Sequence, residues 1–320
     1  MPPFLKNAGI HLVLTIITVM VAGVLGEIML RVKNSDDSNY TIEMWEYARE
    51  LKTISPDPEL GHVHVRSTSA TLQGTEISIN SLGMRGPEPE LPAQGKQTVL
   101  LLGSSITLGW GVPEKNILRA ELERSLGPGY QVLNGGVGNY NTYRAVRFYE
   151  KEWRKTVKPD VIVVHYFVND AEYLPASVSN VLVRNSQLAV TLYYIAQRLL
   201  KGRPSIDSLV DHYKQVYQQE NRGYKYMVAA LKRLREMAAE DGTKVVLSMI
   251  PDIHQLKDYP FDFIHQRMRA LAEELGWTFV DFMKSLGSYK GPELWTIPGD
   301  PHPNAIVHKA MAEQLAPFIK

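Results

Sequence analysis

The stretch from Thr98 to Gly109 constrains the fold more than any other part of the chain. An apolar run ends at Leu102, and a short turn containing Ser104 and Ser105 follows before the sequence becomes helical. The run is short and rich in branched side chains, which favours a strand buried on both faces. A strand that leads into a helix through such a turn places the turn at the carboxyl edge of a parallel sheet, where open α/β folds hold their sites. A serine there is a candidate nucleophile, and a structural Gly-Ser turn is the alternative.

Beyond Gly109, stretches typical of strands and helices alternate, which predicts βα units and a parallel sheet. Residues 171–219 are long for a connection, and their 186–200 section has the apolar spacing of an amphipathic helix. We interpret 171–219 as an insertion over the carboxyl edge that forms a lid or substrate wall, with plain packing as the alternative. The predicted strands are 98–102, 130–133, 161–165, 244–249 and 278–281, and the predicted helices are 114–126, 143–155, 222–240, 261–275 and 304–315.

Residues 8–30 are almost entirely apolar, and only His11 and Glu27 interrupt them. At about 1.5 Å per residue, a helix of this length spans the roughly 30 Å hydrocarbon core of a bilayer. We therefore predict that residues 1–33 form a transmembrane anchor. A cleaved signal peptide is the competing interpretation, although its apolar region usually has about 7–15 residues. Basic residues flank the segment at both ends, so their count does not decide its orientation.

Residues 34–96 are predicted to form a linker and a small N-terminal extension. Within them, 41–51 has the spacing of a short helix, and 61–80 alternates as short antiparallel strands do. His62 and His64 lie two apart, a spacing that can ligate a metal. No third ligand stands out, so we interpret them as an exposed pair on one strand face and predict no metal site.

The charge balance and the absence of cysteine exclude several classes of function. Lys+Arg 35 against Asp+Glu 34 gives a net charge of +1, which offers no electrostatic argument for a nucleic-acid partner. Without cysteine, the chain has no disulfide, no thiolate catalysis and no cysteine-ligated zinc or iron–sulfur centre.

Two further predicted strands end in residues that suit an oxyanion site. A glycine-rich turn, residues 134–142, follows the second strand, and its backbone N–H groups can approach a ligand closely. The turn does not match a dinucleotide-binding fingerprint, because Asn141 stands where the third glycine belongs. After the third strand, the Asn169 amide can point at developing negative charge. A turn-forming Asn-Asp pair is the alternative.

A candidate general base lies near the C-terminus, just before the last predicted helix. His302 stands between two prolines, and Asp300 precedes it by two residues. The carboxylate can hold the imidazole in one tautomer, so that its other nitrogen accepts a proton from a serine. A surface loop with a chance histidine is the alternative.

These four motifs, taken in chain order, resemble those of the SGNH/GDSL-type hydrolases. The resemblance covers roughly residues 97 to 320, and the segment 79–88 resembles the lead-in of membrane-anchored bacterial members. The chain departs from the family pattern at Ser104, where the family has Asp, and at Phe167, where it has Gly. It also has one residue between the Asp and the His instead of two. The motifs stand here as Gly103-Ser104-Ser105 with Gly109, Asn134-Gly135-Gly136, Asn169-Asp170, and Asp300 with His302.

The resemblance implies a flavodoxin-like three-layer α/β/α fold with a five-stranded parallel sheet in residues 97–320. It implies that Ser105 attacks an ester, His302 serves as base and then acid, and Asp300 orients it. The oxyanion hole would consist of the Ser105 N–H, the Gly136 N–H and the Asn169 side chain, with no cofactor. The implied reaction is hydrolysis or transfer of an acyl group, an O-acetyl above all, on an envelope carbohydrate. The catalytic domain would then lie on the outer side of the cytoplasmic membrane.

Two other functions stay open at this point. The first is a catalytically idle SGNH-like module that binds carbohydrate or scaffolds an assembly, which the departures at Ser104 and Phe167 favour. The second is a lipase or thioesterase acting on lipid-like esters, which the anchor and the apolar insertion favour. Between the two serines, we expect only Ser105 to face the cleft, because adjacent residues point in opposite directions. The Ser104 hydroxyl is expected to bond to nearby backbone.

Overall fold

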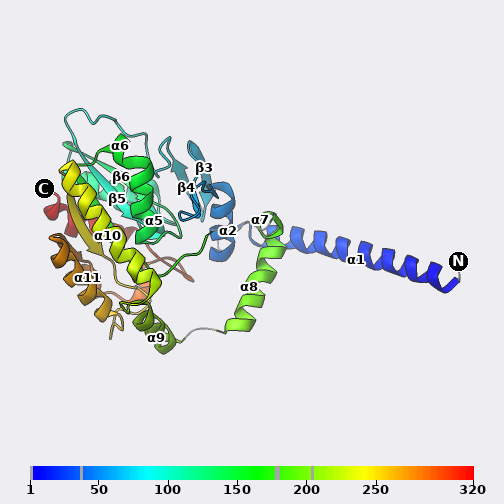
Figure 1. Cartoon of the computed structure of the whole chain (residues 1–320). Coiled ribbons are helices and arrows are strands. Elements are labelled where there is room, and N and C mark those ends of the chain that lie inside the picture. The colour runs from blue at the N-terminus through cyan, green and yellow to red at the C-terminus, as the bar shows by residue number, and fades with distance from the viewer. Residues whose placement is uncertain (1–2, 37–38, 177–180, 203–204) are drawn as a thin grey trace.

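The computed structural model describes residues 3–36, 39–176, 181–202 and 205–320 (Figure 1). Small parts of the predicted segments lie outside the described residues. They are residues 1–2 of the anchor, 37–38 of the linker, and 177–180 and 203–204 of the insertion.

A five-stranded parallel sheet forms the centre of the chain, in the order β6-β5-β7-β8-β9. Its strands are apolar almost throughout, as expected for a sheet covered on both faces. All five coincide with predicted strands, so the α/β prediction is confirmed. Their bounds are β5 (Gln97–Gly103), β6 (Tyr130–Gly136), β7 (Val161–Tyr166), β8 (Lys244–Met249) and β9 (Thr278–Asp281).

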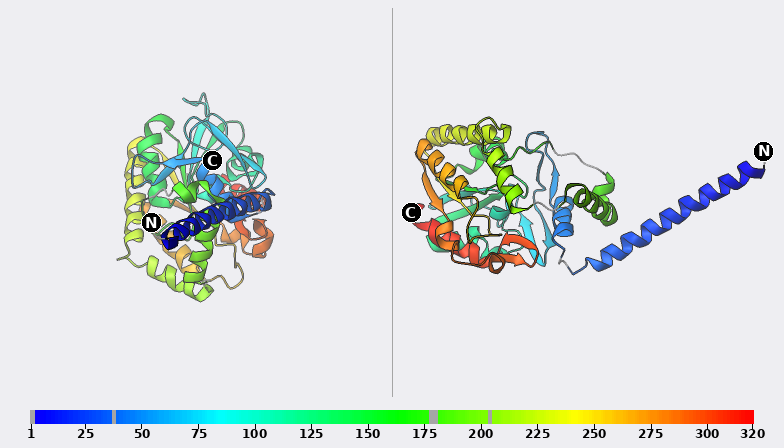
Figure 2. Two further views of the ribbon diagram at one scale, coloured as in Figure 1. Left: turned by 90° about the vertical axis from the view of Figure 1, so that its right-hand side faces the viewer. Right: turned by 90° about the horizontal axis from the view of Figure 1, so that it is seen from below.

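Helices cover both faces of the sheet and complete three layers (Figures 1 and 2). Alternate residues of β5 enter different cores: Leu100 and Leu102 pack on one side, and Val99 and Leu101 on the other. The first core is closed by α5 (Thr142–Phe148), α10 (Arg222–Asp241) and α11 (Asp262–Leu275), and the second by α4 (Leu118–Leu126) and α13 (Ala305–Leu315).

Local sequence sets the ends of these helices. The Asn221 side chain accepts from the first N–H groups of α10, and Asn304 does the same for α13. Gly242 and Gly276 end α10 and α11 in the left-handed conformation. The predicted helix 143–155 is interrupted, because a π-helical segment (Tyr149–Trp153) separates α5 from α6 (Arg154–Val157).

The N-terminal extension packs against the β6 side of the sheet. It contains α2 (Tyr40–Glu50) and two antiparallel pairs, as predicted. The buried Arg85 joins it to the sheet through a bridge to Asn134. One prediction is wrong here: His62 and His64 are buried, because the extension folds over the glycine-rich turn after β6. The paired strands are β1 (Lys52–Ile54) with β2 (His62–His64), and β3 (Thr68–Leu72) with β4 (Thr75–Ile79).

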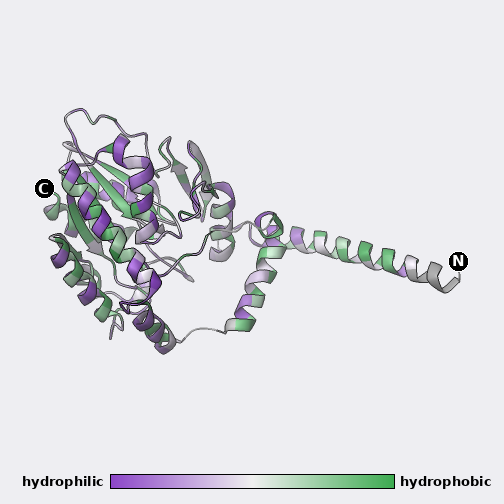
Figure 3. Cartoon of the chain, viewed as in Figure 1, coloured by the Kyte–Doolittle hydropathy of each residue, from purple (hydrophilic) through white to green (hydrophobic). Residues whose placement is uncertain are grey.

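Helix α1 (Pro3–Lys33) projects away from the rest of the chain and is apolar along most of its length (Figures 2 and 3). Its segment Gly9–Lys33 is long and apolar enough to cross a membrane and is not buried in the protein. By length and composition, a membrane anchor and a signal sequence both fit this helix.

The predicted insertion contains α7 (Val181–Asn185), α8 (Gln187–Lys201) and α9 (Ile206–Val216). Helix α8 contacts α1, where Glu27 accepts hydrogen bonds from the Leu188 N–H and the Ser186 hydroxyl. Several apolar side chains of α8 face solvent, among them Leu192, Ile195, Leu199 and Leu200.

Candidate active site

The candidate site lies where the strand order of the sheet reverses. β5 is flanked by β6 on one side and β7 on the other, so the loops after β5 and β7 diverge and leave a crevice at the carboxyl edge. Ser105 begins the short helix α3 (Ser105–Leu108) directly after β5, and Asn169 follows β7. The sheet topology therefore brings these two predicted site residues to one place.

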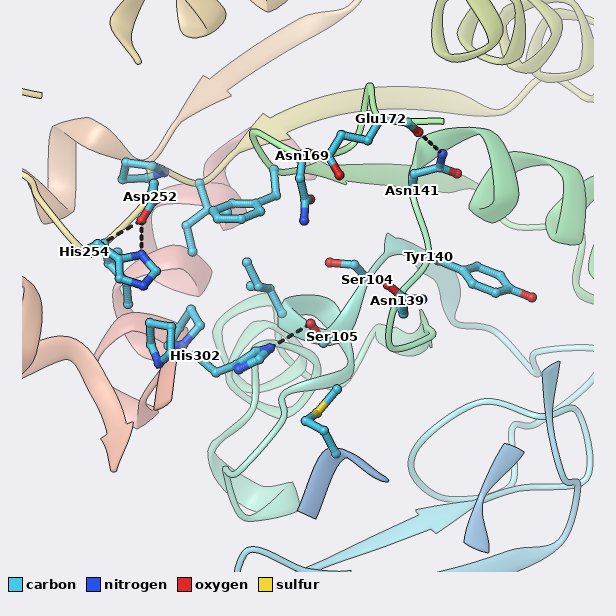
Figure 4. Close-up of a pocket in the computed structure, with 18 of the residues that line it drawn as sticks. Ser104, Ser105, Asn139, Tyr140, Asn141, Asn169, Glu172, Asp252, His254 and His302 are labelled. Atoms are coloured by element: carbon cyan, nitrogen blue, oxygen red, sulfur yellow. Dashed lines mark hydrogen bonds and ion pairs between the residues drawn. The ribbon is translucent and has the colours of Figure 1, made fainter. Parts of the chain in front are cut away.

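Ser105, His302 and Asp300 form a continuous hydrogen-bonded chain (Figure 4 shows its Ser105–His302 part). The Ser105 Oγ lies 2.8 Å from His302 Nε2, and His302 Nδ1 lies 2.7 Å from Asp300 Oδ1. The same Asp300 oxygen accepts the His302 backbone N–H at 3.1 Å. Because a carboxylate only accepts, His302 Nδ1 carries a proton, which leaves Nε2 free to accept the serine proton.

A small hairpin positions the histidine. β11 (Asp300–Pro303) pairs antiparallel with β10 (Trp295–Ile297), and Asn304 then caps α13. The segment that carries His302 is therefore fixed by pairing with β10 and by the start of α13 directly after it. This order of hairpin and helix places the Asp-Pro-His-Pro segment beside α3.

The second oxygen of Asp300 has two donors that are not among the predicted site residues. Oδ2 accepts from Gln73 Nε2 at 2.8 Å and from Trp110 Nε1 at 2.9 Å. Asp300 is fully buried, and burial opposes its ionisation. The hydrogen bonds from His302 and Gln73 outweigh burial and hold the pKa of the carboxyl below its usual value. Gln73 lies 227 positions from Asp300, so no local pattern could have indicated this contact.

Both serines line the cavity, so the expectation that only one faces the cleft is wrong. Ser104 is in an extended conformation just before α3 and Ser105 begins the helix, so the simple alternation of a strand does not apply at this turn. Only Ser105 is hydrogen-bonded to His302. The Ser104 side chain makes no capping bond to α3, contrary to the expected local backbone contact.

The structure does not bring the Gly136 N–H to the cavity, which corrects the predicted oxyanion hole. That N–H donates to the Asn134 side chain at 3.0 Å. A Cβ on Gly136 would overlap Leu108 N, so this glycine allows α3 to pack closely on β6. The close approach of helix and strand explains the glycine without any contact to a ligand.

Three other groups are better placed than Gly136 to face an oxyanion. Asn139 lines the cavity in the left-handed conformation, with φ 64°. The backbone N–H groups of Asn139 and Ser105 have no acceptor within the described part of the chain. The Asn169 side chain points into the cavity from the end of β7 (Figure 4).

The cavity has a volume of about 250 Å³ and a mixed lining. Tyr40 and Met44 of α2 form part of its wall, so the N-terminal extension takes part in the site. Apolar walls come from Ile106, Phe167, Ile250 and Ile253, and polar side chains come from Asn139, Asn141, Asn169, Glu172, Asp252 and His254.

A second Asp–His pair with the same spacing lies on the cavity wall after β8. His254 Nδ1 is 2.5 Å from Asp252 Oδ1, and this hydrogen bond raises the pKa of His254. This pair is not among the predicted site residues, although its Asp-x-His spacing is visible in the sequence. No group of three or more His, Asp or Glu side chains suited to a metal occurs among the described residues.

Comparison with solved structures finds similar chains at low identity. A protein assigned to the G-D-S-L lipolytic family of Desulfitobacterium hafniense is 15% identical, with a TM-score of 0.44, and the match covers 69% of this chain and 99% of that chain. A lipase/acylhydrolase from Enterococcus faecalis is 17% identical (TM-score 0.43; 70% and 95% covered). A carbohydrate acetylesterase from Sinorhizobium meliloti is 13% identical (TM-score 0.42; 70% and 98% covered).

No curated protein matches the chain. The model of the GDSL-like lipase/acylhydrolase family matches residues 101–310, which include Ser105, Asn169 and His302. This match spans most of the chain and includes strands β6 to β9 of the central sheet. The chain therefore belongs to the GDSL-like lipase/acylhydrolase family.

Proposed function

We propose that the protein is a serine esterase in which Ser105 is the nucleophile, His302 the general base and Asp300 the residue that orients it. The observation that carries this proposal is the hydrogen-bonded chain from Ser105 Oγ through His302 to the buried Asp300. A serine hydroxyl is a weak nucleophile at its ordinary pKa, and a neighbouring oriented imidazole activates it.

In the acylation step, Ser105 Oγ attacks the ester carbonyl carbon while its proton moves to His302 Nε2. The tetrahedral intermediate carries negative charge on the former carbonyl oxygen. The Ser105 N–H, the Asn139 N–H and the Asn169 amide stabilise this charge. The intermediate collapses with cleavage of the bond to the alcohol oxygen, and His302 donates its proton to the departing alcohol.

In the second step, His302 takes a proton from water, and the hydroxide formed attacks the acyl-Ser105 ester. Collapse of that intermediate releases the carboxylic acid and returns the proton to Ser105. If a second alcohol replaces water, the same sequence transfers the acyl group. The residues named serve both reactions, so the acceptor decides between hydrolase and transferase.

We infer that the substrate is a small acyl ester, an O-acetyl group above all, on an envelope carbohydrate. A cavity of about 250 Å³ suits a short acyl group better than a long chain. The asparagine amides and the carboxylates of Glu172 and Asp252 on its wall offer partners for sugar hydroxyls. A lipid-like ester is the second candidate, favoured by the exposed apolar side chains of α8.

We further propose that α1 anchors the protein in the cytoplasmic membrane, with residues 34–320 on the outer side. Exposed apolar side chains along α1 support an anchor, because they would be costly in water. The contact between Glu27 and the start of α8 would then place α8 close to the membrane surface.

The full-length protein, purified in detergent, tests the esterase proposal. We expect hydrolysis of p-nitrophenyl acetate, weaker hydrolysis of longer acyl chains, and release of acetate from O-acetylated polysaccharide. Ser105→Ala is the matched control. Equal rates for the wild type and this variant would favour the idle binding module, and a preference for long chains would favour the lipase or thioesterase.

A further inference from the structure

The N-terminal extension forms hydrogen bonds with both backbone polar groups of Gly138, the residue that precedes Asn139. His62 Nε2 lies 2.9 Å from the Gly138 carbonyl oxygen, and Lys52 Nζ lies 3.3 Å from the same oxygen. The Gly138 N–H donates to Tyr47 Oη at 2.9 Å. We call Tyr47, Lys52 and His62 the Gly138 clamp.

The hydrogen-bond directions on the carbonyl side follow from the partners. A carbonyl oxygen only accepts, so His62 Nε2 carries the proton and donates it to Gly138. Nε2 therefore cannot accept from Lys52, and the Lys52 amino group donates to the carbonyl oxygen instead. Two donors thus converge on one backbone oxygen.

The directions on the N–H side are equally determined. His64 Nδ1 lies 2.9 Å from the Gly83 carbonyl oxygen and must donate to it, which leaves His64 Nε2 as an acceptor. Tyr47 donates its hydroxyl proton to that nitrogen at 2.7 Å and accepts the Gly138 N–H. The Tyr47 ring also occupies the space of a Cβ on Gly138, so only glycine fits there.

Burial of these three polar side chains is costly. Lys52 and His62 are each 8% exposed, and Tyr47 is fully buried. Burial lowers the pKa of Lys52 to about 7 and that of His62 to about 3. Apolar side chains at such positions are often as stabilising as buried polar ones or more so. The polar clamp therefore calls for a role beyond packing.

The geometry of the peptide bond gives that role. The only cis bond in the described part of the chain is Leu91–Pro92, so the Gly138–Asn139 peptide is trans. In a trans peptide, the C=O and the next N–H point in opposite directions. The Gly138 oxygen faces the buried clamp, so the Asn139 N–H points away from the clamp. Asn139 itself lines the cavity together with Ser105.

We propose that the Gly138 clamp positions and polarises the Asn139 N–H as an oxyanion donor for an ester at Ser105. Donors on the carbonyl oxygen of a peptide strengthen its N–H as a donor. Tyr47, Lys52 and His62 are positioning residues, since they act through the backbone and do not touch the substrate. The inference rests on the proposed esterase function and adds a requirement for the extension.

Paired variants of full-length protein test the carbonyl side. His62→Leu removes the donor, whereas His62→Gln keeps an N–H near the position of Nε2. We expect His62→Leu to lower kcat by about 10- to 100-fold with little change in KM, because small misplacements of a reacting group have effects of that size. His62→Gln should restore most of the rate.

A second pair tests the N–H side. Tyr47→Phe removes the acceptor for Gly138 and should lower kcat with little change in KM. Tyr149→Phe is its matched control, because Tyr149 is also a buried tyrosine but has no hydrogen-bond partner in the described structure and does not line the cavity. It should keep the wild-type kcat.

Titration of Ser105 with a fluorophosphonate separates positioning from simple loss of folded protein. If positioning is correct, the fraction of reactive Ser105 stays at the wild-type value while the rate constant of labelling falls. A wild-type rate constant in His62→Leu, or a smaller reactive fraction with an unchanged rate constant, overturns the proposal. If wild-type protein neither labels nor hydrolyses esters, the esterase proposal itself fails.

Discussion

Gln73 Nε2 donates to Asp300 Oδ2 at 2.8 Å and thereby joins the hairpin of β3 and β4 to the candidate triad. This bond stabilises the ionised carboxylate, whose pKa lies below its usual value. A hydrogen bond to a charged group is worth about 1.5–3 kcal/mol.

We expect Gln73→Leu to raise the pKa of Asp300 and move the acidic limb of the kcat/KM profile to higher pH. Loss of a donor to the ionised carboxylate makes Asp300 more basic, so the hydrogen-bonded pair of Asp300 and His302 holds its proton up to a higher pH. Measurement of kcat/KM against pH checks this. Trp110→Phe, which removes the other donor to Oδ2, should shift the profile in the same direction. A profile identical to wild type would contradict the role given to Gln73.

The two adjacent serines differ in their contact with His302, and we expect them to differ in function. Ser105→Ala should reduce activity to the residual level left by binding and the oxyanion hole, whereas Ser104→Ala should keep most of it. A fluorophosphonate probe should label wild type and Ser104→Ala but not Ser105→Ala. Peptide mapping that places the label on Ser104 would overturn the assignment.

Asn169 is expected to act in the transition state. Asn169→Ala should lower kcat by about 10²–10³ with little change in KM, because its amide would stabilise charge that the ground state lacks. Steady-state kinetics on p-nitrophenyl acetate, with thermal unfolding as a control for folding, measures this. A folded variant of near-normal rate would make Asn169 a turn residue.

Asp170 is expected to make stability depend on pH. It is buried, accepts from Thr142 at 2.7 Å, and burial raises its pKa to about 7. The folded state therefore holds this proton more tightly than the unfolded state does. The stability linked to it is fully present below the unfolded pKa of about 3.9 and is lost as pH rises through about 7.

The variant Asp170→Asn removes this titration. The free energy of unfolding of this variant minus that of wild type should increase steadily from about pH 4 to pH 7. The total increase should be a few kcal/mol. Urea unfolding at several pH values measures the difference. A pH-independent difference would show that the carboxyl does not titrate as described.

The strands of the central sheet were predictable because they are short apolar runs rich in branched side chains, which favour buried strands. β6 nevertheless continues to Gly136, beyond the predicted end, since glycine is disfavoured in strands and conceals the extension. Helix 143–155 looked continuous because apolar spacing alone does not reveal a π-helical segment. Ser105, Asn169 and His302 could be named because each follows a predicted strand or precedes the last predicted helix, and because the motifs that hold them resemble those of one family.

The remainder of the site depends on contacts between distant segments. Nothing near Gln73 or Trp110 indicates a bond to Asp300. The alternating pattern of residues 61–80 places His62 and His64 on one strand face. It does not reveal that the glycine-rich turn covers this face. That turn holds three glycines, and only packing shows that Gly136 serves the contact with α3.

The membrane proposal predicts the outcome of fusions at the C-terminus. If α1 inserts with residues 34–320 outside, an alkaline phosphatase fusion should be active and a green fluorescent protein fusion dark. Assays of both fusions in cells distinguish the two orientations. The opposite pattern would place the catalytic domain in the cytoplasm.

The contacts of the N-terminal extension also determine which part of the chain can be exchanged between relatives. The family match begins at residue 101, after Gln73 and the whole Gly138 clamp. Consider a chimera in which only the matched segment is exchanged between relatives. Its proposed nucleophile and base would come from one protein. The residues that contact the Gly138–Asn139 peptide and the Asp300 carboxylate would come from the other. On the esterase proposal, the segment that must be exchanged as one unit therefore starts at α2 rather than at β5.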